Sequence, residues 1–174
     1  MDSVSKLSLQ NQQDFIRLKE LGLQDSDKLA QFLFQMAREK DIRRIISILP
    51  KLEETFPTDA SIASAACDIW NLAEQKLFAL NSAERAARLD SHNCKYVTQY
   101  MLCLLALNKV QVANQLYNQL QEVIPEGDSK AYSVAAQIAF RLNKYDAAVA
   151  NYESAISLEP NNPVLHYSLG AVQR

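Results

Sequence analysis

Glycine and proline are scarce in this sequence. Its 174 residues contain three glycines and five prolines. A sandwich or barrel of many strands needs a turn roughly every 8–12 residues, and these two residue types form most such turns. The composition therefore argues against a many-stranded β fold. The hydrophobic fraction of 48% and the charged fraction of 22% are ordinary for a folded domain.

Neither basic nor acidic residues are in clear excess. Lysine and arginine number 18, aspartate and glutamate number 20, and the formal net charge is −2. Proteins that bind nucleic acid usually carry a clear basic excess. We therefore expect no nucleic-acid partner, and the same balance argues against RNA binding through helical repeats of the pentatricopeptide kind.

No segment of the sequence resembles a signal peptide or a membrane span. Residues 1–6 lack the basic start and apolar run of a signal peptide. The longest nearly uncharged apolar stretch, residues 96–107, is interrupted by Thr98 and Gln99 and is shorter than the ~20 residues that a span needs. We expect a soluble protein of the cytoplasm with no membrane partner.

The reactive side chains do not form a recognisable site. Cys67, Cys94 and Cys103 are odd in number and follow no disulfide framework, so the sequence predicts free thiols in a reducing compartment. His92 with Cys94 and Cys103 falls short of the four ligands in paired spacings that structural zinc requires. We expect no metal and no cofactor.

No candidate for catalysis emerges either. Glycine is too scarce for a loop that cradles phosphate, and no orienting group marks a cysteine–histidine nucleophile pair. Glu53 and Glu54 are adjacent carboxylates, but we expect them on a solvated helix end. The sequence predicts that this segment is not an enzyme.

What the sequence does contain is an internal repeat. Residues 107–125 read LNKVQVANQLYNQLQEVIP and residues 142–160 read LNKYDAAVANYESAISLEP, so six of nineteen positions match at an offset of 35. The same register extends through the chain with spacings of 34, 34, 35 and 34 residues. The units begin at Ser26, Ala60, Cys94, Ser129 and Pro163.

Hydrophobic periodicity places two helices in each unit. In the fourth unit one apolar stripe at helical spacing is Tyr132, Ala135, Ala136 and Ala139, and the other is Ala148, Tyr152, Ala155 and Leu158. We expect first helices near 27–39, 60–73, 95–106, 129–141 and 163–174. We expect second helices near 42–55, 77–89, 110–123 and 145–157.

Small residues in these stripes predict close helix packing. Alanine at Ala136, Ala148 and Ala155 lets two backbones approach, and we expect Tyr145 and Tyr152 to fill the wider gaps beside them. Neither helix pair can bury both of its faces alone, so the units are expected to stack.

These residues resemble the tetratricopeptide repeat. The fourth unit carries the residues of that pattern at Tyr132, Ala136, Tyr145, Ala148, Tyr152, Ala155 and Pro160, and the fifth begins it at Leu169 and Gly170. The resemblance covers about four full repeats and the start of a fifth. It implies an all-α, right-handed superhelical solenoid of antiparallel helix pairs, with units at 26–59, 60–93, 94–128, 129–162 and 163–174.

Two places depart from the pattern. Residues 1–25 are expected to cap the array with a short helix near 11–21 that ends at Gly22. Pro50 falls inside the second helix of the first unit, where it would cost ~3 kcal/mol, so we expect helix 42–49 to end early and restart after it.

The resemblance also implies a binding surface. First helices line the concave face in this family, and carrying the register over gives candidate groove residues for a peptide or partner helix. These are Gln31, Phe34, Arg38, Asp68, Asn71, Lys95, Gln99, Lys130, Gln137 and Arg141. The subfamily that clamps the terminal carboxylate of heat-shock chaperones is not matched, because Ala30, Phe34, Ala65 and Val134 replace its donors.

The expected function is a protein–protein interaction scaffold. The alternative is a non-catalytic N-terminal module of a longer enzyme, as in some bacterial sulfotransferases or glycosyltransferases. The fifth unit is partial, and we expect Leu165 and Leu169 to expose one side there and to favour self-association or fraying beyond Pro163.

Overall fold

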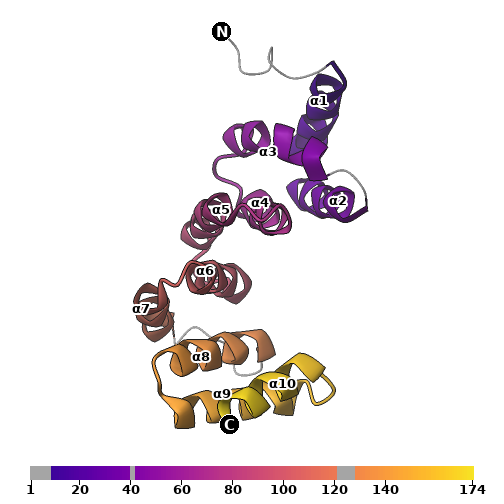
Figure 1. Ribbon diagram of the computed structural model, residues 1–174. Coiled ribbons are helices and arrows are strands. Elements are labelled where there is room, and N and C mark those ends of the chain that lie inside the picture. Colours follow the sequence, from indigo (N-terminus) through magenta and orange to yellow (C-terminus); the bar gives the residue numbers. More distant parts are fainter. Residues whose placement is uncertain (1–8, 40–41, 121–127) are drawn as a thin grey trace. The chain divides into compact units, whose positions relative to one another are not determined.

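The computed structural model describes residues 9–39, 42–120 and 128–174 (Figure 1). Within these ranges the chain forms ten α-helices and no strand, which confirms the predicted all-α class. The helices are α1 (Leu9–Gln24), α2 (Ser26–Glu39), α3 (Ile42–Thr55), α4 (Ala60–Leu72), α5 (Lys76–Leu89), α6 (Cys94–Ala106), α7 (Val110–Leu120), α8 (Ser129–Arg141), α9 (Tyr145–Leu158) and α10 (Pro163–Val172).

The predicted helix bounds agree with the structure to within one or two residues for α2 to α6 and for α8 to α10. Polar caps account for several of the starts. The Asp59 and Asp128 carboxylates accept hydrogen bonds from the Ile62 and Ala131 backbone N–H groups at 2.9 and 3.0 Å. The end of the predicted helix 110–123 and Pro125 lie outside the described residues.

The chain divides into two compact units, Met1–Ser91 and His92–Arg174, called here the N-terminal unit and the C-terminal unit. In the N-terminal unit α4 packs against α2, α3 and α5, and α1 packs against α2 and α3. Large aliphatic side chains fill the space between these helices. Those with no exposed surface are Leu29, Leu33, Ile45, Ile48, Leu49, Leu52, Ile62 and Ile69.

Helix α1 is longer than predicted. It continues through Gly22 to Gln24, so the expected end of the helix at Gly22 is wrong. A Cβ atom at Gly22 would lie 2.6 Å from both Leu29 Cδ2 and Phe56 Cζ. The absence of a side chain at Gly22 therefore lets Leu29 and Phe56 of the first repeat pack closely against α1, and the glycine does not form a turn.

Polar contacts join α1 to α3. Asp14 forms an ion pair with Arg44, and the Asn11 side-chain amide donates to Ser47 Oγ at 2.8 Å. Together with the buried Phe15, these contacts attach α1 to the first repeat.

Helix α3 is continuous across Pro50, so the predicted interruption is wrong. Pro50 is exposed, while Leu49 and Leu52 on either side of it are fully buried. Packing of that apolar face holds the helix together where the local preference of proline would end it.

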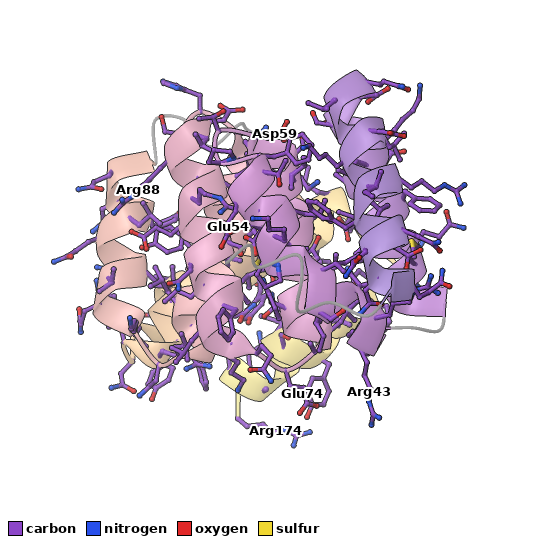
Figure 2. All side chains as sticks on the ribbon, turned by 90° about the horizontal axis from the view of Figure 1, so that it is seen from above. Arg43, Glu54, Asp59, Glu74, Arg88 and Arg174 are labelled. Atoms are coloured by element: carbon purple, nitrogen blue, oxygen red, sulfur yellow. The ribbon has the colours of Figure 1, made fainter. Side chains whose placement is uncertain are left out.

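A buried acidic side chain joins three helices of the N-terminal unit, and this corrects the expected solvated position of Glu53. The side chain of Glu53 is 13% exposed. Its carboxylate accepts hydrogen bonds from Trp70 Nε1 of α4 at 3.0 Å and from Ser82 Oγ of α5 at 2.7 Å, and it pairs with Arg85 at 2.7 Å. Glu54, labelled in Figure 2, is 66% exposed as expected.

In the C-terminal unit α8 and α9 form a hairpin on which α10 packs (Figure 1). Ala148 and Ala155 are fully buried, as their small size predicts, and Tyr152 is 5% exposed. Tyr145 does not fill a gap in the core. It is 50% exposed and its ring meets the edge of Phe140, with the two centroids 6.0 Å apart.

In the second, third and fourth repeats the turns between the two helices share one backbone conformation. Glu74, Asn108 and Asn143 have φ angles of 59°, 57° and 58°. In each turn the next N–H donates to a carbonyl five residues back, the bond that closes a Schellman motif. These bonds are Gln75 to Trp70 at 2.8 Å, Lys109 to Leu104 at 2.8 Å, and Lys144 to Ala139 at 2.9 Å.

Candidate interaction surface

The predicted groove residues lie on the first helices of the repeats, and they divide between the two units. The N-terminal unit carries Gln31, Phe34 and Arg38 on α2 and Asp68 and Asn71 on α4. The C-terminal unit carries Lys95 and Gln99 on α6 and Lys130, Gln137 and Arg141 on α8.

In the N-terminal unit the candidates on α2 and α4 differ in exposure. Gln31, Arg38 and Asn71 are exposed, whereas Phe34 and Asp68 are half-buried. The Arg38 guanidinium carbon lies 5.8 Å from the centre of the Phe34 ring, within range of a cation–π contact. Because α2 and α4 pack directly on each other, these residues belong to neighbouring first helices.

In the C-terminal unit two lysines occupy equivalent positions. Lys95 is the second residue of α6 and Lys130 is the second residue of α8. Both side chains are exposed, and within the described residues neither forms an ion pair. Because α6 and α8 pack against each other, the two ammonium groups contribute positive charge to adjacent first helices.

Gln99 and Gln137 are less accessible than the lysines. Gln99 is only 7% exposed, so its side chain is largely removed from any ligand at the surface. Gln137 is half-buried.

Arg141 lies at the other end of α8 from Lys130, beside a turn of the preceding repeat. Its guanidinium donates to Asn108 Oδ1 at 3.4 Å. Both residues line an open hollow of about 420 Å³ together with Lys109 and Leu142. With a rise of ~1.5 Å per residue, the eleven residues from Lys130 to Arg141 place their backbones ~16 Å apart. The charges of Lys130 and Arg141 therefore lie on different parts of the candidate surface.

The half-exposed thiol near this surface is not activated. Burial raises the pKa of Cys94, and the carboxylate of Asp128 adds to that effect although a contact with Thr98 opposes it. A raised pKa keeps the thiol protonated at neutral pH, which disfavours nucleophilic chemistry. Cys67 and Cys103 are buried.

The side chains needed for a metal site or a membrane span do not come together in the part of the chain that the structure describes. No group of three or more histidine, cysteine, aspartate or glutamate residues is arranged to hold a metal ion there. No helix in the same residues is both long and apolar enough to cross a bilayer.

The start of the fifth unit differs from its prediction. Leu165 is 4% exposed and joins Ala136, Tyr152 and Ala155 in one buried cluster, and Leu169 packs against that cluster. The expectation that Leu165 and Leu169 expose one side is therefore wrong for Leu165, because α10 packs it into the preceding hairpin.

Two exposed apolar residues on α10 were missed. Val164 is 67% exposed and Tyr167 is 79% exposed. They lie 34 residues after Lys130 and Ser133, so they hold the equivalent positions of the fifth unit. The repeat register could have identified Val164, since Lys130 is a candidate groove residue, and Tyr167 follows it by three residues on the same side of the helix.

Comparison with known proteins agrees with the repeat. Residues 136–173 match the family model described as TPR repeat. Over 141 residues the chain is 28% identical to interferon-induced protein with tetratricopeptide repeats 2 of Cricetulus griseus. That match covers 81% of this chain but spans only 27% of the length of the relative.

Solved structures share the fold at low identity. A structure of the MamA protein has a TM-score of 0.68 at 15% identity, covering 85% of this chain and 81% of that one. YrrB, described as a TPR protein with an unusual peptide-binding site, has a TM-score of 0.65 at 16% identity, covering 89% and 81%.

The first TPR of Spaghetti (RPAP3), solved with the HSP90 peptide SRMEEVD, has a TM-score of 0.59 at 23% identity, covering 66% of this chain and 90% of that one. The paired helices, their turns at a spacing of 34 and 35 residues and these likenesses together show that the chain has the fold of tetratricopeptide repeat structures, with residues 136–173 matching the TPR repeat itself.

Proposed function

We propose that this chain is a protein-interaction scaffold that binds an extended peptide segment across its first helices. The observation that carries the proposal is the pair of equivalent lysines, Lys95 and Lys130, both exposed and, in the described part of the chain, without an acidic partner. Ammonium groups repeated on adjacent helices favour a ligand with acidic side chains.

The other candidate residues are proposed to make contacts of the same kind, each within its own unit. In the N-terminal unit they are Gln31, Phe34, Arg38, Asp68 and Asn71, and in the C-terminal unit Gln137 and Arg141. The mixed polar character of these side chains suits backbone and side-chain hydrogen bonds to an extended segment. Gln99 is expected to contribute little, because it is buried.

Two structural relatives support peptide binding as the mode of interaction. YrrB is described by its peptide-binding site, and the RPAP3 domain is bound to a peptide with three acidic residues. The donors must differ here, since Ala30 and Ala65 stand where the carboxylate-clamping subfamily has side-chain donors. The present proposal therefore depends on the lysine pair and not on that clamp.

Charge reversal tests the proposal. A fluorescein-labelled peptide, selected from a random displayed library on the wild-type chain, would be titrated by anisotropy into Lys95→Glu/Lys130→Glu. We expect affinity to fall at least ~10-fold and the salt dependence to weaken, since two attractive charges become repulsive. Lys76→Glu/Lys144→Glu makes the same net change at exposed residues outside the candidate surface and is the matched control.

A peptide whose affinity is indifferent to both the Lys95/Lys130 reversal and salt would contradict the electrostatic basis of the proposal. An equal loss of peptide affinity in the matched control variant would show that only the net charge of the protein matters.

A further inference from the structure

The first helices of the C-terminal unit carry a row of three equivalent residues. Lys95, Lys130 and Val164 are each the second residue of their helix, in α6, α8 and α10. All three are exposed. Tyr167 follows Val164 by three residues and therefore lies on the same side of α10. The row changes from basic to apolar along the array.

Val164 and Tyr167 are not part of the core of the unit. The residue of α10 that enters the core is Leu165, which contacts the cluster formed by α8 and α9. Val164 and Tyr167 keep 67% and 79% of their surface exposed. Two large apolar side chains, three residues apart and exposed on a helix whose other face is already packed, offer an apolar surface to a ligand.

A second helix of the fifth repeat would not be expected to cover Val164. Lys95 and Lys130 hold the same position in repeats that do have their second helices, α7 and α9, and both lysines remain exposed. Ser133, the counterpart of Tyr167 in the fourth repeat, is half-buried. A tyrosine side chain is much larger than serine, so at this position its ring would extend past the atoms that partly cover Ser133. The apolar pair therefore belongs to the face that carries the lysines.

We propose that Val164 and Tyr167 form an apolar subsite at one end of the basic row, and that the partner segment combines acidic side chains with one large apolar side chain. This inference rests on the proposed function and names the chemistry of its ligand. The lysines attract the acidic residues, while the α10 pair removes an aliphatic or aromatic side chain from water.

The helix spacing sets the order of residues in such a ligand. Helix α6 packs on α8, and residues of α8 and α10 share one cluster. Packed helices lie ~8–10 Å apart, and an extended chain advances ~3.3 Å per residue. The two lysine subsites are therefore about three residues of an extended chain apart, and we take one further repeat step of the same length to reach Val164. The motif is acidic–x–x–acidic–x–x–apolar, in either chain direction.

The test begins with peptide selection from a random displayed library on the whole chain. Enriched sequences are synthesised and their affinities are measured by anisotropy for wild type and for Val164→Ser/Tyr167→Ser. We expect enrichment of an apolar residue about three positions from an acidic one, and a loss of affinity of ~10-fold or more in the variant. Leu158→Ser, which removes a 42%-exposed apolar side chain from α9, is the matched control.

The outcomes separate this inference from the proposed function. Acidic peptides without an apolar residue, bound equally by wild type and Val164→Ser/Tyr167→Ser, would overturn the subsite but leave the scaffold proposal standing. Selection of no peptide would overturn both. Equal losses in the Leu158→Ser control would also refute the assignment to α10. Circular dichroism of Val164→Ser/Tyr167→Ser checks that the loss of affinity is not caused by a loss of folding.

Discussion

Three residues at the turns within repeats adopt a backbone conformation that few side chains tolerate. Asn108 and Asn143 suit the left-handed region, because asparagine enters it more easily than most residues. Glu74, labelled in Figure 2, has the same φ near 59° without that advantage. Its Cβ and the neighbouring carbonyl oxygen are crowded, so the turn after α4 is the strained one of the three.

Replacing Glu74 should therefore stabilise the protein. We expect Glu74→Gly to raise the free energy of unfolding by about 0.5–1 kcal/mol, the relief of strain exceeding the added freedom of the unfolded chain. Urea denaturation would measure the change. Glu74→Ala removes the same charge but keeps the Cβ, so it should give no comparable gain. A gain from alanine as large as that from glycine would attribute the effect to charge.

At the scale of the helices, the Glu53 carboxylate is the clearest polar link. It accepts from Trp70 on α4 and from Ser82 and Arg85 on α5. Arg85 is only 30% exposed, and its Nε atom is buried without a partner. Removal of the acceptor would leave several donors of two helices unsatisfied at once.

We expect Glu53→Ala to destabilise the protein by about 2–3 kcal/mol, since buried donors that lose their acceptor retain their desolvation cost. Thermal and urea melts would measure this loss. Glu54→Ala is the neighbouring control and should stay within about 0.5 kcal/mol, because Glu54 is 66% exposed. Equal effects of the two substitutions would show that the network contributes no net stability.

The packing of α9 gives a second test at this scale. Ala148 is fully buried, so Ala148→Leu should overpack the contact and cost about 1–3 kcal/mol. Ala150→Leu places the same side chain on the exposed side of α9 and should leave the melting temperature nearly unchanged. An unchanged melting temperature for Ala148→Leu would contradict the tight approach of α9 to its neighbours.

The contrast between these elements shows what sequence could predict. Helix positions followed from the apolar period and the repeat spacing, and small residues such as Ala148 marked close approaches. Continuity through Pro50, the packing role of Gly22 and the burial of Glu53 all depend on side chains distant in sequence. The equivalent positions of Lys95 and Lys130 could be found from the repeat register, but the burial of Gln99 and the hydrogen bond from Arg141 to Asn108 could not.

At the scale of the whole molecule, each compact unit contains a buried thiol. Cys67 lies in the N-terminal unit and is fully buried, while Cys103 lies in the C-terminal unit and is 4% exposed. A buried thiol reacts with an alkylating reagent only when the structure around it opens. The two cysteines can therefore report the opening of the two units separately.

We expect pulsed alkylation with N-ethylmaleimide, read by peptide mass spectrometry, to give opposite responses in two variants. Ala148→Leu should accelerate labelling of Cys103 more than that of Cys67, because it weakens the C-terminal unit. Glu53→Ala should do the reverse. If both variants accelerated both thiols by one common factor, the array would open as a single cooperative body and the two units would not be energetically distinct.

The matching turns also bear on how such a chain can change its length. Residues 109–143 begin directly after one left-handed residue, Asn108, and end on the next, Asn143. A tandem duplication of this segment would therefore join two ends of the same backbone conformation, and every helix downstream would keep its register. Gene recombination at these turns could add or delete whole repeats, and each added repeat would supply one more first helix to the proposed interaction surface.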